Sequence, residues 1–105
     1  MASESLIGNS QQTKDIDGHF GISVWSVPDL AADEIANVCR IPHGRIRVAT
    51  VGDIRAAGFT IISTPEHGYG HHNIVLGSLP DEATCDRLRS VFHDERDNPR
   101  KTTGA

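Results

Sequence analysis

The chain has 105 residues, of which 37% are hydrophobic and 23% are charged. A chain of this length forms one small domain with a modest core, and because such a domain is only marginally stable, we expect a partner protein or an oligomer. The formal net charge is −4, from 10 Lys and Arg against 14 Asp and Glu. This acidity disfavours tight, sequence-independent binding of nucleic acid.

No hydrophobic run approaches the roughly 20 residues that span a bilayer, and no N-terminal leader pattern is recognisable. Cys39 and Cys85 lie within apolar segments, where a thiol behaves as a small hydrophobic group. P-loop, GxGxxG and CxxC patterns, which mark nucleotide and redox sites, do not occur. We therefore expect a cytoplasmic protein with reduced cysteines, no membrane contact and no cofactor.

The two ends of the chain are predicted to be disordered tails. Residues 1–17 are mostly polar, and Leu6 and Ile7 form an isolated apolar pair that cannot offset the entropy of ordering. Residues 95–105 are charged and contain Pro99, which stops helices. The folded domain is expected to cover residues 18–94.

Two similar segments, residues 21–39 and 73–91, lie within this domain. Each contains a β-branched run followed by Ser, Pro and Asp, namely Ser26, Pro28 and Asp29 or Ser78, Pro80 and Asp81. Proline suits the first turn of a helix, and an aspartate there can cap the free amides. Each segment therefore predicts a strand, a turn and an amphipathic helix. The apolar stripes of the two helices are Ala31, Ile35, Val38 and Cys39, and Cys85, Leu88, Val91 and Phe92.

The region between these segments predicts further short elements. Residues 45–48 alternate like a strand, and Thr50 and Asp53 have the spacing of a capping box for a short helix that Gly58 would end. Residues 59–63 and 74–76 are apolar and predict an antiparallel hairpin.

The predicted class is α+β, a small single domain in which an antiparallel sheet carries amphipathic helices on one face. If the two similar segments pack as equivalents, their strands are neighbours in the sheet.

The candidate metal ligands are Cys39, His43, His67 and His71. Thiolate and imidazole suit zinc, but Gly68 and Gly70 interrupt any helix that would align His67 with His71. Strand alternation would also separate His71 from His72. The acids of DIDGH at residues 15–19 are interpreted as part of a turn. We therefore predict no metal site and a solvated histidine loop.

The histidines also allow metal-independent cleavage of RNA, as in small ribonucleases or toxin-like enzymes. Imidazole titrates near neutrality, and arginine offers a planar fork to phosphate oxygens. The candidate catalytic residues are His43, His67, Tyr69, His71 and His72, with Arg45 or Arg47 for the phosphate. Because no spacing among them is diagnostic, no catalytic residue is assigned.

Residues 34–76 resemble part of the bacterial winged helix-turn-helix regulators. Ile35 and Ala36 match the first helix of that pattern, Ile41 and Pro42 its turn, Gly58 the end of its second helix, and residues 67–72 its wing. The resemblance implies DNA binding through Arg45 and Arg47. It requires one continuous helix over residues 43–57, whereas Gly44, Gly52 and Thr50 interrupt that segment.

Size and composition favour a small bacterial-type binding module over an enzyme. We expect a protein partner, as for an antitoxin-like or regulatory subunit. The expected contact residues are Arg45, Arg47, Arg55 and Trp25, and Arg45 and Arg47 could also contact nucleic acid. The ribonuclease and the winged-helix regulator are the alternatives.

Overall fold

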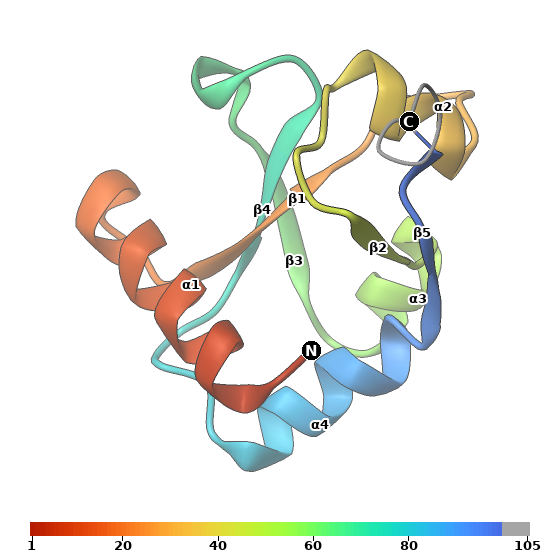
Figure 1. Ribbon diagram of the computed structural model, residues 1–105. Helices are drawn as coiled ribbons and strands as arrows, with labels where there is room; N and C mark the ends of the chain where they lie inside the picture. The colour runs from red at the N-terminus through yellow and green to blue at the C-terminus, as the bar shows by residue number, and fades with distance from the viewer. Residues whose placement is uncertain (100–105) are drawn as a thin grey trace.

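Figure 1 shows the computed structural model, which describes residues 1–99. The elements in chain order are α1 (Ser3–Asp17), β1 (Gly21–Trp25), α2 (Ala32–Val38), β2 (Arg45–Val48), α3 (Val51–Ala56), β3 (Thr60–Ser63), the 3₁₀ turn η1 (Pro65–His67), β4 (His71–Val75), α4 (Glu82–Val91) and β5 (Asp94–Asp97). Three strands form an antiparallel sheet in the order β1-β4-β3, and β2 pairs with β5. The predicted α+β class is confirmed.

The core lies on one face of the three-stranded sheet. Ile74 of β4 stands opposite Ile22 of β1 and Ile61 of β3, so these side chains form a row across that face. Helices α1, α3 and α4 add Leu6, Ile54, Cys85 and Leu88 to the same core. The predicted hairpin is confirmed, and the strands of the two similar segments are neighbours, as expected.

Three of the predicted helix ends are confirmed. The Asp81 carboxylate accepts the Thr84 N–H at 2.8 Å at the start of α4, and the Thr50 hydroxyl accepts the Asp53 N–H at 3.0 Å at the start of α3. Gly58 follows α3 with a φ of +92°, a conformation that favours glycine. Residues 44–57 form β2 and α3 and not one continuous helix.

Helix α2 differs from the prediction. It begins only at Ala32, because Asp29 adopts a φ of +68° in the preceding turn and does not cap the helix. The Glu34 carboxylate instead accepts the Ala31 N–H at 3.2 Å. The buried residue is Ala36, whereas Val38 of the predicted stripe is 48% exposed.

The predicted disorder of residues 1–17 is wrong, because this segment forms α1 beside β1 (Figure 1). Its buried residues are Leu6, Ser10 and Thr13, one turn or two turns apart. The Asn9 Oδ1 accepts the Ser23 N–H at 3.2 Å and so covers part of the outer edge of β1. Since two of the three buried side chains are polar, the helix has no apolar periodicity that the sequence could reveal.

The predicted disorder after residue 94 is wrong for β5, whereas residues 100–105 of that tail lie outside the described residues. Four charged residues form β5 and pair with β2, and the register places Arg47 opposite Glu95. The buried Asn98 follows the strand and donates from Nδ2 to the carbonyls of Ile41 at 2.9 Å and His43 at 2.8 Å. Charge pairing and a buried amide hold a strand that has no apolar residue.

Candidate functional site

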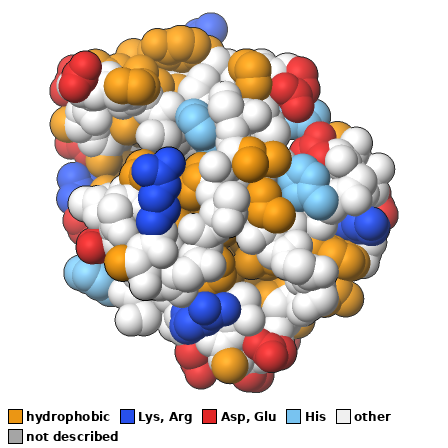
Figure 2. All heavy atoms as spheres, turned by 180° about the vertical axis from the view of Figure 1, so that it is seen from behind, with side chains coloured by type: hydrophobic (Ala, Val, Ile, Leu, Met, Phe, Trp, Pro, Cys, Tyr) orange, Lys and Arg blue, Asp and Glu red, His pale blue; other side chains and the backbone are white. Residues whose placement is uncertain are grey.

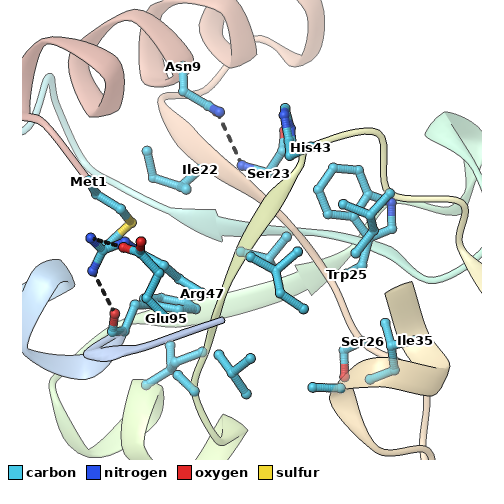
Figure 3. A pocket seen from close by; sticks show the side chains of 18 of the residues that line it. Met1, Asn9, Ile22, Ser23, Trp25, Ser26, Ile35, His43, Arg47 and Glu95 are labelled. Atoms are coloured by element: carbon cyan, nitrogen blue, oxygen red, sulfur yellow. Dashed lines mark hydrogen bonds and ion pairs between the residues drawn. The ribbon is translucent and has the colours of Figure 1, made fainter. Parts of the chain in front are cut away.

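A groove of about 630 Å³ lies between the three-stranded sheet and β2 (Figure 3). This volume is within the range of roughly 300–1,000 Å³ that is typical of ligand sites. All of residues 22–26 and 45–49 line it, together with side chains from α1, α2 and α3. Its apolar wall includes Val24, Ile35, Ile46, Val48 and Ile61, which are only half-buried. The groove therefore exposes apolar surface that the fold does not cover.

One side of the groove is the outer edge of β1. In an antiparallel pair, the backbone groups of alternate residues point away from the partner strand. The Ser23 N–H donates to α1 and not to β4, which shows that Ser23 points outward. By the same alternation, the N–H and C=O of Trp25 also face outward from this edge, where residues 1–99 provide no partner strand.

The other side of the groove is the outer edge of β2. The Asn98 N–H donates to the Gly44 carbonyl at 2.9 Å, so Gly44 points toward the β5 side of the ladder. Arg45 and Arg47 therefore direct their backbone N–H and C=O groups away from β5. Two strand edges, one from each sheet, thus line the same groove.

The side chains of Arg45 and Arg47 are paired with β5. Arg45 lies 2.7 Å from both Glu95 Oε1 and Asp97 Oδ1, and Arg47 lies 2.6 Å from Glu95 Oε2. The hydrogen bond from Arg45, with the nearby charge of Arg47, lowers the pKa of the Glu95 carboxyl. The charges of Arg45 and Arg47, two of the expected contact residues, are therefore balanced by carboxylates within the fold. On the face in Figure 2, the basic side chains of the described residues are separated by other types, and Arg55 is exposed on α3.

A second cluster forms where η1 leads into β4. The rings of His67 and His71 meet edge to face with their centroids 5.3 Å apart. Gly68 and Gly70 have φ values of +128° and +77°, and they turn the chain so that the two rings converge without a shared helix. The expectation that these glycines keep the histidines apart is wrong.

Two hydrogen bonds orient the His67 side of this cluster. Asp17 Oδ1 lies 2.6 Å from His67 Nε2, and the buried Asn73 donates from Nδ2 to Asp17 Oδ2 at 3.0 Å. The Asp17 hydrogen bond raises the pKa of His67, and the same bond lowers the pKa of Asp17. His67 is therefore held in its charged form over a wider pH range.

His71 has the opposite environment. It is only 7% exposed, and its Nδ1 shares a hydrogen bond of 2.6 Å with Thr64 Oγ1. Burial lowers its pKa, and the nearby charge of His67 lowers it further. The pKa values of two neighbouring imidazoles are thus shifted in opposite directions, which separates the roles of proton donor and proton acceptor. A cleft of about 190 Å³, lined in part by Asp17, His67 and His71, opens beside them.

The other residues proposed from the sequence are not part of this pair. His43 is exposed and lines the groove, and Tyr69 is 64% exposed. His72 lies on the opposite face of β4 from His71, as the strand alternation predicted, and its Nδ1 is 2.8 Å from the Gly70 carbonyl oxygen. Trp25 lines the groove and contacts the edge of His71, with ring centroids 5.2 Å apart.

The four proposed metal ligands do not form one group. Cys39 Sγ packs against Gly70, where a Cβ would lie 2.6 Å from the sulfur, and burial raises the pKa of the thiol. Within residues 1–99, the side chains that could share a metal ion are Asp17, Glu66 and His67. Sequence reasoning missed Asp17 because it was assigned to a turn after a disordered tail. The acids of DIDGH were the signal that could have identified it.

None of the helices in the described part of the chain is long and apolar enough to cross a membrane. Comparisons of the chain with protein-family models, curated proteins and solved structures give no match.

Proposed function

We propose that the protein is a binding module that accepts an extended segment of a partner protein in the groove between β1 and β2. The observation that supports this proposal is the pair of strand edges on the two sides of the groove. An added strand can hydrogen-bond to exposed strand edges, which is a common mode of peptide recognition. One inserted strand would connect the three-stranded sheet with the β2–β5 pair.

The walls of the groove define the chemistry of that segment. Val24, Ile46 and Val48 offer half-buried apolar surface, so a strand with alternating apolar side chains would bury it. Arg47 and Glu95 lie at one end as an ion pair (Figure 3), which favours a polar residue there. Backbone hydrogen bonds would provide affinity, and the apolar wall would provide selectivity.

The paired state of Arg45 and Arg47 favours a protein over a nucleic acid as the partner. To bind phosphate, these side chains would have to release Glu95 and Asp97, which already supply the opposite charge. Their backbone groups remain accessible from the groove. A bacterial-type, antitoxin-like or regulatory subunit acting in the cytoplasm is the setting we propose. The free thiols of Cys39 and Cys85 are consistent with a reducing compartment.

The surroundings of His67 and His71 support ribonuclease activity less well than the groove supports peptide binding. Acid–base chemistry on RNA needs a cation near the phosphate, as well as a proton donor and a proton acceptor. The carboxylates of Asp17 and Glu66 act on both His67 and His71, and they repel a phosphodiester. We therefore assign the groove, and not this cluster, to the main function.

The proposal is tested by titrating ¹⁵N-labelled protein with extended peptides selected from a random library. We expect chemical-shift changes in residues 22–26 and 45–49, and slower hydrogen exchange at the amides of Trp25 and Arg47. Arg47→Pro removes an outward N–H at a position where an edge strand tolerates proline. Arg47→Ala is the matched control, because it removes the same ion pair with Glu95 and keeps the N–H. We expect the proline variant to bind at least about 10-fold more weakly than the alanine variant.

Equal affinity of the two Arg47 variants, or shift changes confined to other surfaces, would contradict strand addition. Binding of small apolar molecules without binding of any peptide would do the same. Light scattering coupled to gel filtration detects the remaining occupant, a second copy of the chain. If a dimer forms and Arg47→Pro dissociates it whereas Arg47→Ala does not, the inserted strand comes from the protein itself.

A further inference from the structure

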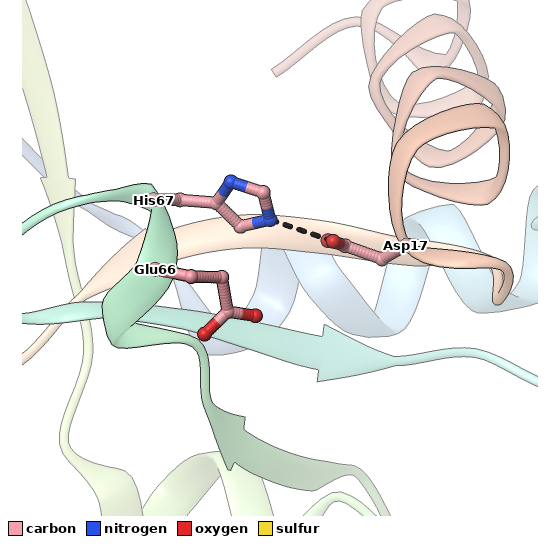
Figure 4. Close-up of side chains that lie close together, drawn as sticks. All are labelled: Asp17, Glu66 and His67. Carbon is pink, nitrogen blue, oxygen red and sulfur yellow. Dashed lines mark hydrogen bonds and ion pairs between the residues drawn. The ribbon is translucent and has the colours of Figure 1, made fainter.

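We infer that Asp17, Glu66 and His67 bind one divalent transition-metal ion, and that Asn73 positions Asp17 for this role. The ligand atoms of the three side chains all lie within 4.8 Å of one another (Figure 4). Two carboxylates and an imidazole form a suitable donor set for Zn²⁺ or Mn²⁺, with open positions for water. None of these three ligands lines the groove, and the inference does not depend on the function proposed for it.

The fold brings these ligands together from distant parts of the sequence. Asp17 ends α1, whereas Glu66 and His67 belong to η1. The side chains of Asp17 and His67 are 15% and 29% exposed, and Asp17 Oδ1 is 2.6 Å from His67 Nε2. Metal–ligand bonds of about 2.0–2.2 Å place two donor atoms roughly 3 Å apart. A small separation of these two side chains, with release of the proton from His67 Nε2, would therefore admit an ion.

Asn73 gives independent support for a ligand at this position. It is fully buried, and its Nδ2 donates to Asp17 Oδ2 at 3.0 Å, in the manner of the outer residues that orient metal-binding carboxylates. Its Oδ1 is buried and has no hydrogen-bond partner among the residues that the structure describes. Such buried oxygens are rare in folded proteins. Because both atoms belong to one amide group, this unpaired oxygen lies close to the Asp17 carboxylate.

The adjoining cleft provides space for the remaining ligands. Its volume is about 190 Å³, and Gln12, Thr13, Asp17 and His67 are among the residues that line it. This space is sufficient for several water molecules. Asp17 and Glu66 also supply two negative charges, which attract a divalent cation.

The inference is tested by isothermal titration of the tag-free, chelator-treated full-length protein with ZnCl₂ and with MnCl₂. We expect one bound ion per chain. Glu66→Gln is the decisive variant, because Glu66 is exposed and no hydrogen bond or ion pair of its side chain is found in residues 1–99. We expect Glu66→Gln and Asp17→Asn to weaken binding at least about 10-fold. Asp15→Asn, on the same helix but outside the cluster, should leave the affinity within about two-fold.

Paramagnetic broadening by Mn²⁺ gives a second readout, because it should first affect the NMR signals of residues 17, 66, 67 and 73. Binding of neither metal, or unchanged affinity of Glu66→Gln and Asp17→Asn, would overturn the inference. Broadening centred on His43 or Cys39 would also overturn it, since the ion would then occupy a different site. None of these outcomes affects the peptide titration of the groove.

Discussion

Replacing Leu6 by Ala tests whether α1 is docked onto the sheet. Leu6 is 4% exposed and belongs to the same core as Ile22 and Leu88. In a disordered tail the substitution would hardly change the free energy of unfolding. In the docked helix it removes most of a buried side chain from that core.

The expected loss follows from the surroundings of Leu6. Replacing a buried leucine by alanine costs about 2–5 kcal/mol. Leu6 also borders the groove, so its neighbours can relax into the space that the substitution leaves. We therefore expect the lower part of this range, about 2–3 kcal/mol. For a domain of this size, this corresponds to a decrease in Tm of roughly 10–20 °C.

Urea denaturation followed by the fluorescence of Trp25, the single tryptophan, measures this loss. Ile7→Ala is the matched control, because Ile7 is the next residue of the helix but is 38% exposed. It should change stability by less than about 0.5 kcal/mol. Gly8→Ala should have the opposite sign, because an added Cβ meets no atom of the described residues within 4 Å. Its higher helix propensity should add about 0.5–1 kcal/mol.

The reasoning fails if Leu6→Ala and Ile7→Ala have the same small effect and Gly8→Ala does not stabilise the protein. That result would mean that α1 is not formed on the sheet in solution.

The hydrogen bond from the Thr84 N–H lowers the pKa of Asp81. The ionised Asp81 carboxylate therefore stabilises the folded state above its ordinary pKa of 3.8, and this stabilisation is lost as the pH falls through the lower pKa of the folded state. Asp81→Asn keeps a capping oxygen without titrating, so its stability difference from the parent should disappear in acid, as urea midpoints between about pH 2 and pH 6 would show. Gly70→Ala should cost about 1–3 kcal/mol in the same assay, because φ is +77° and the new Cβ would lie 2.6 Å from Cys39 Sγ. A loss below about 0.5 kcal/mol would contradict that contact. Since burial raises the pKa of Cys39, native protein at neutral pH should react with iodoacetamide more slowly than urea-unfolded protein, as measured by mass spectrometry.

The sequence predicted those features whose causes lie within a few residues. The caps at Thr50 and Asp81, the end of α3 at Gly58 and the buried stripe of α4 all depend on neighbours in the chain. The antiparallel hairpin of β3 and β4 also follows from local apolar runs. Because these signals are local, they were sufficient for the α+β class.

The predictions of disorder, which also rested on local sequence, were wrong at both ends of the folded region. Helix α1 is stabilised by Leu6 in the core and by Asn9 at the edge of β1, and neither contact leaves a periodic pattern in the sequence. Strand β5 is held by Arg45, whose partner Glu95 lies 50 residues away. Amino-acid composition alone does not reveal contacts between residues that are so far apart in the sequence.

The two candidate sites depend on the tertiary structure in the same way. The groove exists because β1 and β2 present their outer edges to one space, which no single segment specifies. The cluster exists because α1 delivers Asp17 to the turn that carries His67. The sequence by itself thus determined the short elements and their caps, since these depend on neighbouring residues. Only the tertiary structure decided which charged and polar side chains meet, because those contacts join segments that are distant along the chain.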